Sequence, residues 1–250
     1  MLAAMNLGRD RTAVVAHRGD RTAARENTVD AFRAARVAGA DGVEFDVRRT
    51  RDRHLVVLHD AARPGLGTLA EHTLAEIRAA APWLPTLDEA IGACTGMWVN
   101  LEIKNTPADP DFDEERTAAV TVARLIGARH LHRSVLISSF DPLTTAAVRG
   151  ADGRIVTGLL VSPGTPPADG VELAVGNGDG AVHLHHGDGD DAAGGMVAAR
   201  AAGLPIVAWT VNDADEVRRL ADAGAAAIIT DRPGAAVAAL QTGTSGLSGR

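Results

Sequence analysis

The stretch "VVAHRGDRTAARENTVDAFRAARVAGADGVEFDVRRT", residues 14–50, holds two short apolar runs. Between them lies a segment near 27–38 with the length and composition of a helix. Asn27 precedes this segment as a predicted N-cap, and Gly39 follows it as a helix terminator. The stretch therefore predicts a strand, a helix and a second strand in that order.

The same alternation continues along the 250 residues. Eight strands are predicted, at 13–17, 42–48, 98–104, 135–139, 157–161, 181–186, 206–212 and 227–231. Helices are predicted near 27–38, 86–94, 114–127, 142–149, 191–202, 213–223 and 234–241. Eight strands separated by helices in a chain of this length favour a (β/α)8 TIM barrel over an open doubly wound sheet. The glycine-rich dinucleotide fingerprint is also absent after the first strand.

Three segments add detail to the predicted barrel. A β-like run at 54–59 follows the second strand after a turn, which predicts a small β-hairpin extension. The segment 162–176 contains two consecutive prolines and gives only a weak helix signal. No linker divides the chain, so we expect a single domain over 1–242 and a flexible tail over 243–250.

Composition excludes several classes of protein. The net charge is −7, which argues against a general nucleic-acid or anionic-membrane surface. No run approaches the ~20 apolar residues of a membrane span, so no stable membrane insertion is expected. The N-terminus has no apolar region typical of a signal peptide. Cys94 is the single cysteine, which excludes an intrachain disulfide. Together these features predict a cytoplasmic protein.

Polar residues gather where the predicted strands end. In a (β/α)8 barrel the active site lies at the C-terminal ends of the strands. Residues two apart on a strand also point to the same face. The residues placed at this end of the barrel are His17, Glu44, Asp46, His59, Asn100, Glu102, Lys104, Ser139, Trp209 and Asp231.

Three of these residues, Glu44, Asp46 and Glu102, are carboxylates that would meet at one place. Crowded like charges resist ionising together, and a divalent cation removes that conflict. All-oxygen ligation suits a hard ion, so the sequence predicts one Mg²⁺ or Ca²⁺. The alternative is that polar residues at strand ends only cap loops, but three converging carboxylates favour the metal site.

The remaining polar residues complete a site for phosphate chemistry. Arg18 and Lys104 would add positive charge for a phosphate. His17 and His59 could act as general acid and general base. Trp209 is assigned to the wall of the substrate pocket. Metal, cationic side chains and a histidine pair together predict phosphodiester cleavage.

A second group of histidines lies in the sequence "HLHH", at His183, His185 and His186. The group resembles a metal cluster, but alternate spacing on a strand is weak evidence for one. A lining or structural role is therefore favoured for these three residues.

The ordered motifs resemble the glycerophosphodiester phosphodiesterase family. They are "HRG" at 17–19, "ENT" at 26–28, "EFD" at 44–46 and "HD" at 59–60. Later blocks that resemble the family are "EIK" at 102–104, "SSF" at 138–140, "WTVN" at 209–212 and "TDRP" at 230–233. The resemblance covers residues 13–240.

The resemblance implies a (β/α)8 barrel that hydrolyses glycerophosphodiesters to glycerol 3-phosphate and an alcohol. Such a substrate is a small molecule, for example glycerophosphocholine or glycerophosphoethanolamine. The roles carried over are His17 and His59 as acid/base residues, Glu44, Asp46 and Glu102 as metal ligands, and Arg18 and Lys104 as phosphate contacts. Asp60 could orient an imidazole. The nucleophile, water or a neighbouring hydroxyl of the substrate, stays open, as does the role of each histidine.

A barrel of this type also supports other functions. A lysophospholipase-D-like enzyme would need an acyl-chain groove, and a non-catalytic phosphate-binding barrel would be expected to lose a histidine or a carboxylate. A sugar-phosphate isomerase or aldolase would use a Schiff-base lysine or a lone acid–base pair.

The chain departs from the family pattern in two places. Arg25 stands where a proline usually precedes "ENT", which adds a charge to the loop above the site. Only 26 residues, 61–86, separate Asp60 of "HD" from Leu87. This segment is shorter than the family's usual insertion and predicts a more open pocket or an atypical substrate.

Overall fold

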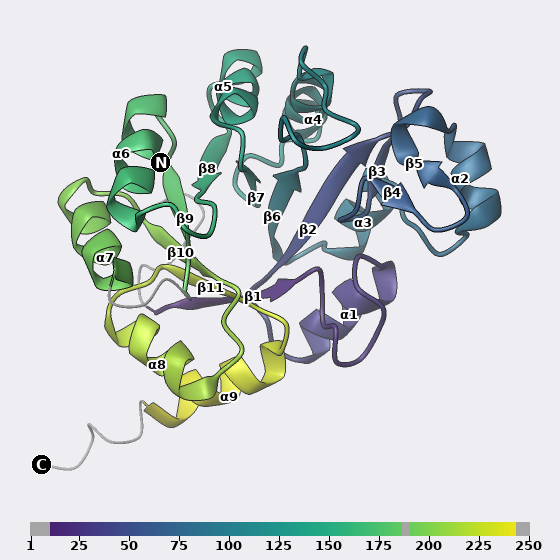
Figure 1. The fold of residues 1–250 in the computed structure, drawn as a ribbon. Helices are drawn as coiled ribbons and strands as arrows, with labels where there is room; N and C mark the ends of the chain where they lie inside the picture. Colours follow the sequence, from purple (N-terminus) through teal and green to yellow (C-terminus); the bar gives the residue numbers. More distant parts are fainter. Residues whose placement is uncertain (1–10, 187–190, 244–250) are drawn as a thin grey trace, which may run out of the picture.

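The computed structural model describes residues 11–186 and 191–243. Within this part of the chain, parallel strands pair in a closed ring, because β1 bonds to both β2 and β11 (Figure 1). The eight strands of the ring are β1 (Ala13–His17), β2 (Gly42–Arg49), β6 (Trp98–Ile103), β7 (Val135–Ser139), β8 (Val156–Leu160), β9 (Ala181–His185), β10 (Ile206–Trp209) and β11 (Ala227–Thr230). The predicted (β/α)8 barrel is confirmed.

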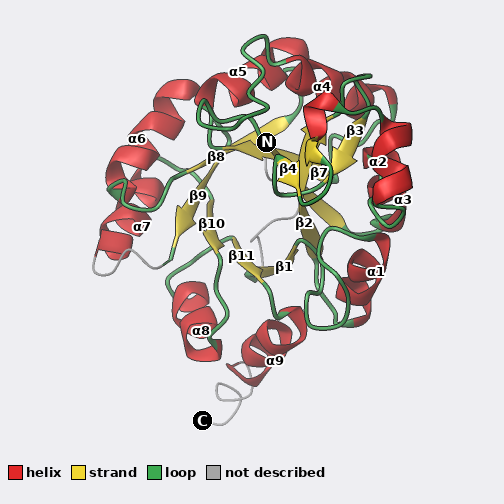
Figure 2. Cartoon of the chain, turned by 45° about the vertical axis from the view of Figure 1, so that its right-hand side comes forward, coloured by secondary structure: helices red, strands yellow, loops and turns green. Residues whose placement is uncertain are grey.

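Helices surround this ring of strands, as Figure 2 shows. Those that follow the barrel strands are α1 (Val29–Val37), α3 (Leu87–Ala93), α4 (Thr117–Ala128), α5 (Pro142–Ala151), α6 (Pro167–Asn177), α7 (Asp191–Ala201), α8 (Ala214–Asp222) and α9 (Pro233–Gly243). Local capping fits the sequence: Asp213 accepts hydrogen bonds from the first turn of α8, as an N-cap should.

Successive side chains of β2 point alternately toward the helices and into the barrel. Val43, Phe45 and Val47 are buried in the layer between the barrel and the helices. There Phe45 packs against Phe32 of α1, with ring centroids 5.3 Å apart. Since successive strand residues point to opposite faces, Glu44, which lies between Val43 and Phe45, points into the barrel.

The predicted hairpin extension is present. β3 (Leu55–Val57) pairs antiparallel with the end of β2, with Val47 opposite Val57. The segment that follows contains further elements that were not predicted: β4 (Ala62–Arg63), β5 (Gly67–Thr68), the 3₁₀ turn η2 (Leu69–Glu71) and α2 (Leu74–Ala80). Of these elements, η2 and α2 pack against β3 and the residues after α2 in a small apolar core made by Val56, Leu69, Ile77, Ala81 and Leu84. The short segment after His59 is therefore a compact unit beside β3.

The weak helix signal after the fifth strand corresponds to a complete helix. α6 begins at Pro167, the first helical position, where the missing N–H of proline costs no helical hydrogen bond. The predicted tail over 243–250 begins at the last residue of α9, and 244–250 lie outside the described residues. Among the described residues, no helix has the length and apolar character needed to cross a membrane.

Candidate active site

Three carboxylates meet at the C-terminal end of the barrel. In the β2–β6 ladder Asp46 lies opposite Glu102, and in the β1–β2 ladder His17 lies opposite Glu44. One oxygen from each of Glu44, Asp46 and Glu102 lies within 4.8 Å of the other two, and all three residues are buried. The register of two neighbouring strands, β2 and β6, thus brings together the three carboxylates that the sequence placed at one site, and β1 adds His17 beside them.

The electrostatics of this cluster fit a bound cation. Burial raises the pKa of Glu44 well above its usual value, and the charges of Asp46 and Glu102 raise it further. Glu44 accepts a hydrogen bond from the backbone N–H of Arg18 at 3.0 Å through Oε2. Its Oε1 is buried without a hydrogen-bond partner among the described residues. Buried carboxylate oxygens with so few hydrogen-bond donors around them suit a hard divalent ion.

Two cations flank the carboxylates. Lys104 Nζ lies 2.8 Å from Glu102 Oε1 and 3.7 Å from Asp46 Oδ1, and Arg18 Nε lies 3.3 Å from Asp46 Oδ2. Burial alone would raise the pKa of Asp46, but Lys104 and Arg18 outweigh it and lower that pKa. The lowered pKa favours the ionised form of Asp46, which has two positive charges next to it.

His17 is fixed between two carboxylates. Its Nδ1 lies 2.7 Å from Asp231 Oδ1, and its Nε2 lies 3.9 Å from Glu44 Oε2. Asp231 also accepts hydrogen bonds from Arg21 and Asn212. Burial would raise the pKa of Asp231, but these hydrogen bonds and the His17 imidazole lower it strongly. Asp231 remains ionised and orients the ring so that Nε2 faces the carboxylate cluster.

His59 lies at the mouth of the barrel after β3. Its Nδ1 lies 2.7 Å from Asp60 Oδ1, and both side chains are more exposed than the His17 pair. Its backbone carbonyl accepts a hydrogen bond from Arg48 Nε at 2.8 Å. Arg48 is 3% exposed and also pairs with Asp111 Oδ1 at 2.5 Å. A buried guanidinium thus ties the backbone of His59 to the loop after β6.

The loop after β1 differs from the prediction at Asn27. The N-cap of α1 is Thr28, whose hydroxyl accepts from Ala31 N–H, so the prediction that Asn27 caps the helix is wrong. Asn27 is instead buried and donates from Nδ2 to Asp46 Oδ2 at 2.8 Å. Gly19 in the same loop has φ +85°, and a Cβ there would lie 2.6 Å from Ala31 Cβ. Position 19 therefore requires glycine, because any larger side chain there would clash with α1.

Trp209 forms part of the opposite wall of the mouth. Its indole N–H donates to the carbonyl of His183 at 3.1 Å. Its ring makes edge contacts with Phe140 and His185, with centroid distances of 5.5 and 5.0 Å. The indole N–H is therefore already used within the protein, and the predicted role of Trp209 as a wall of the substrate pocket stays a prediction.

The model of the family described as "Glycerophosphoryl diester phosphodiesterase family" matches residues 17–235. The chain belongs to the glycerophosphoryl diester phosphodiesterase family. The match begins at His17 and includes every carboxylate of the cluster.

Individual members of this family resemble the chain over most of its length. A glycerophosphodiester phosphodiesterase of Caldanaerobacter subterraneus subsp. tengcongensis is 30% identical over 241 residues, which cover 89% of this chain and 95% of that protein. A phosphodiesterase of Oleispira antarctica, solved in complex with the product sn-glycerol-3-phosphate, is 26% identical with a TM-score of 0.76, covering 92% of this chain and 97% of that one. A putative glycerophosphoryl diester phosphodiesterase of Silicibacter pomeroyi shares the fold, with a TM-score of 0.82 at 23% identity and coverage of 96% and 97%.

Sequence reasoning missed two residues of the site in this family member. Asp231 was placed at the end of the last strand but given no role, although Ala16 pairs with Thr230 in the β1–β11 ladder. That pairing brings Asp231 beside His17, so barrel closure is the signal that could have identified it. Arg48 carried no such signal, since its partners come from a loop far along the chain.

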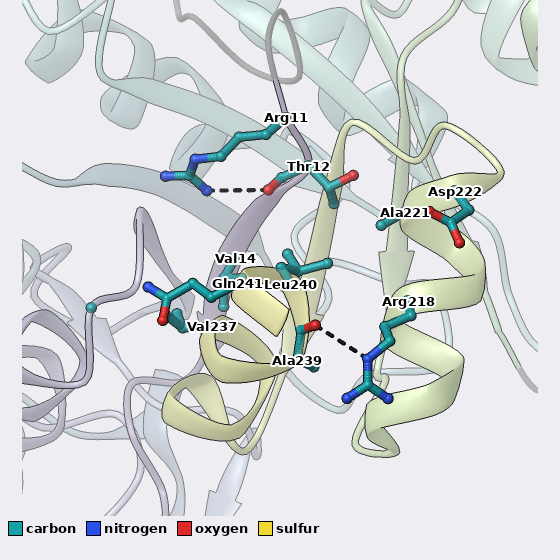
Figure 3. Close-up of a pocket in the computed structure, with 11 residues that line it drawn as sticks. Arg11, Thr12, Val14, Arg218, Ala221, Asp222, Val237, Ala239, Leu240 and Gln241 are labelled. Atoms are coloured by element: carbon teal, nitrogen blue, oxygen red, sulfur yellow. Dashed lines mark hydrogen bonds between the residues drawn. The ribbon is translucent and has the colours of Figure 1, made fainter. Parts of the chain in front are cut away.

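A separate hollow of about 580 Å³ lies at the other end of the barrel, by the start of β1 and the helices α8 and α9 (Figure 3). Arg218 lines it and donates to the carbonyl of Ala239 at 3.2 Å. Its lining includes one carboxylate, Asp222, and no histidine. The hollow has none of the groups of the carboxylate site and is not part of it.

Proposed function

We propose that the protein hydrolyses glycerophosphodiesters to glycerol 3-phosphate and an alcohol, with one Mg²⁺ or Ca²⁺ held by Glu44, Asp46 and Glu102. The observation that carries this proposal is the convergence of three buried carboxylates beside His17. Family membership supports the same activity: the relatives from Caldanaerobacter subterraneus and Oleispira antarctica are phosphodiesterases, and phosphoric diester hydrolysis is the chemistry this site suits.

The charged residues around the cluster have distinct roles in this proposal. A divalent cation bound there would act as a Lewis acid on a non-bridging phosphate oxygen. Arg18 and Lys104 would stabilise the negative charge that builds on the phosphoryl oxygens. Asn27 holds Asp46 in place by its 2.8 Å hydrogen bond, so that this carboxylate keeps its orientation.

Each of the two histidines would transfer a proton to or from the reacting groups through its Nε2. Asp231 holds Nδ1 of His17, and Asp60 holds Nδ1 of His59, each at 2.7 Å. In each ring Nε2 is thereby left for the reaction. One histidine would take the proton of the nucleophile, and the other would protonate the leaving alkoxide.

The substrate panel that tests this function contains glycerophosphocholine, glycerophosphoethanolamine, glycerophosphoinositol and bis(p-nitrophenyl) phosphate. We expect release of glycerol 3-phosphate from the first three, and losses of at least about 100-fold in kcat for His17→Ala and His59→Ala. Full turnover by both variants would contradict the acid/base assignment. Lysophosphatidylcholine is assayed beside this panel: its hydrolysis without turnover of the first three substrates would favour a lysophospholipase-D-like activity. Binding of the first three without turnover would favour a phosphate-binding barrel.

We also propose a cytoplasmic location. The single cysteine, Cys94, is buried and free. Burial raises the pKa of its thiol to about 12, so the thiolate is disfavoured. Fusion to a fluorescent protein, followed by fractionation of the host cells, tests this location.

A further inference from the structure

One cluster of side chains at the mouth of the barrel has no role in the mechanism above. The guanidinium carbon of Arg25 lies 4.3 Å from the ring centroid of Trp83, and that of Arg63 lies 4.9 Å from the same centroid. Arg25 comes from the loop after β1, Arg63 from β4, and Trp83 from the loop between α2 and α3. We call these three residues the arginine–tryptophan cluster.

The two arginines of the cluster are not neutralised. Within residues 11–186 and 191–243, neither Arg25 nor Arg63 has a carboxylate within ion-pair distance. The two charged groups lie less than about 10 Å apart, since each is within 5 Å of one ring centre. Two like charges held this close repel each other. The protein has a net charge of −7, so acidic residues outnumber basic ones, yet none of the described carboxylates is placed against either arginine. An arrangement of this kind is typical of a site that receives an anion.

The cluster lies close to the reacting groups along each of its three segments. Arg25 directly precedes Glu26, whose Oε1 accepts from Arg18 Nη1 at 2.9 Å. Arg63 follows His59 by four residues.

The third segment is tied to the strand that carries His59. The backbone N–H of Val57 in β3 donates to the carbonyl of Pro85, two residues after Trp83. The arginine–tryptophan cluster therefore lies on the His59 side of the mouth, and its Arg63 belongs to the unit formed by β4, β5 and α2. Trp209 and Phe140 belong to a different wall, built on β10 and the end of β7.

We propose that Arg25, Arg63 and Trp83 form a subsite for a second phosphate group, carried by the alcohol that leaves the scissile phosphodiester. This inference rests on the proposed function, because it assigns the substrate class of the same site. A guanidinium stacked on an indole keeps its N–H edge free, and that edge matches a phosphate in two-pronged hydrogen bonding. The indole also limits the motion of both arginines, so less side-chain freedom is lost when the phosphate binds.

A matched pair of substrates isolates the second phosphate. In glycerophosphoglycerol the leaving alcohol is uncharged glycerol, whereas in bis(glycerophospho)glycerol the leaving glycerol carries a second phosphodiester. We expect the wild-type protein to have the higher kcat/KM for bis(glycerophospho)glycerol, by about tenfold at low salt. This preference should shrink as NaCl is raised to 0.5 M, because exposed charges are screened.

Substitutions test which residues cause the preference. In Arg25→Gln/Arg63→Gln we expect kcat/KM for bis(glycerophospho)glycerol to fall about tenfold, through KM, while glycerophosphoglycerol stays within twofold of wild type. Trp83→Leu should lose much of the same preference. The control is Arg124→Gln, which removes one exposed charge from α4 on the outside of the barrel.

The outcomes separate this inference from the proposed function. Turnover of glycerophosphoglycerol without any preference for the second phosphate would overturn the subsite and leave the function standing. An equal loss on both substrates in the double variant would also overturn it, since that result indicates a purely structural role. Absence of turnover of either substrate by the wild type would overturn the proposed function itself.

Discussion

His183 allows a quantitative prediction about stability. Its side chain is fully buried in the barrel, and both ring nitrogens are without a hydrogen-bond partner among the described residues. The ring lies over Gly158, where a Cβ would come within 2.5 Å of His183 Nε2. Burial lowers the pKa of His183 from 6.5 to about 3, because the charged imidazole would lose its hydration there.

The folded and unfolded states of the protein differ in proton uptake at His183, and this difference decides how the free energy of unfolding changes with pH. Below pH 6.5 the unfolded chain binds a proton at His183, whereas the folded protein does not until the pH approaches 3. The stability contributed by the neutral ring is therefore complete above pH 6.5 and falls as the pH drops. At 1.36 kcal/mol per pH unit, the folded protein loses about 2 kcal/mol between pH 7 and pH 5 from this residue alone.

The variant His183→Leu removes this titration while keeping a side chain of similar size in the barrel. We expect urea unfolding, followed by tryptophan fluorescence, to show that the wild type loses about 2 kcal/mol more than the variant between pH 7 and pH 5. His130→Asn, at an exposed histidine with φ +56°, is the control and should track the wild type. Parallel pH curves for wild type and His183→Leu would refute the reasoning.

The remaining predictions concern the site. Asp231→Asn should lower kcat by about 10- to 100-fold, because a charge-assisted hydrogen bond to His17 worth about 1.5–3 kcal/mol is lost; an unchanged kcat would show that His17 needs no such partner. Asp60→Asn should have a smaller effect, because the Asp60–His59 pair is exposed and its charge interaction is screened by water. The affinity for Mg²⁺ or Ca²⁺, measured by calorimetry, should fall as the pH is lowered, because burial and like charges raise the pKa of Glu44 and a proton competes with the cation. An affinity independent of pH between 5 and 8 would contradict that coupling.

The barrel and the carboxylate cluster were predictable because local patterns carry them. Each barrel strand is a short apolar run, and the period of two on β2 separates Glu44 and Asp46 from their outward neighbours. Parallel strands end at one rim, so residues from distant parts of the chain could be placed together from their positions on the strands alone. His17 and Glu102 were located in this way.

Other features depend on contacts that a sequence pattern does not contain. The unit of β4, β5 and α2 has strands of only two residues, too short to show any period. Asparagine is a common helix N-cap, but the side chain of Asn27 donates its hydrogen bond to Asp46 on the next strand instead. The stacking of Arg25 on Trp83 joins residues 58 positions apart, and nothing in either segment indicates the other.

The central claim is that hydrolysis depends on a divalent cation held by Glu44, Asp46 and Glu102. The direct measurement is the rate of glycerol 3-phosphate release from glycerophosphoethanolamine by protein treated with EDTA, before and after Mg²⁺ or Ca²⁺ is returned. We predict that the rate falls to background in EDTA, recovers when the cation is added, and stays at background for Glu44→Gln under both conditions. A full rate in EDTA, or a Glu44→Gln variant as active as the wild type, would contradict the account.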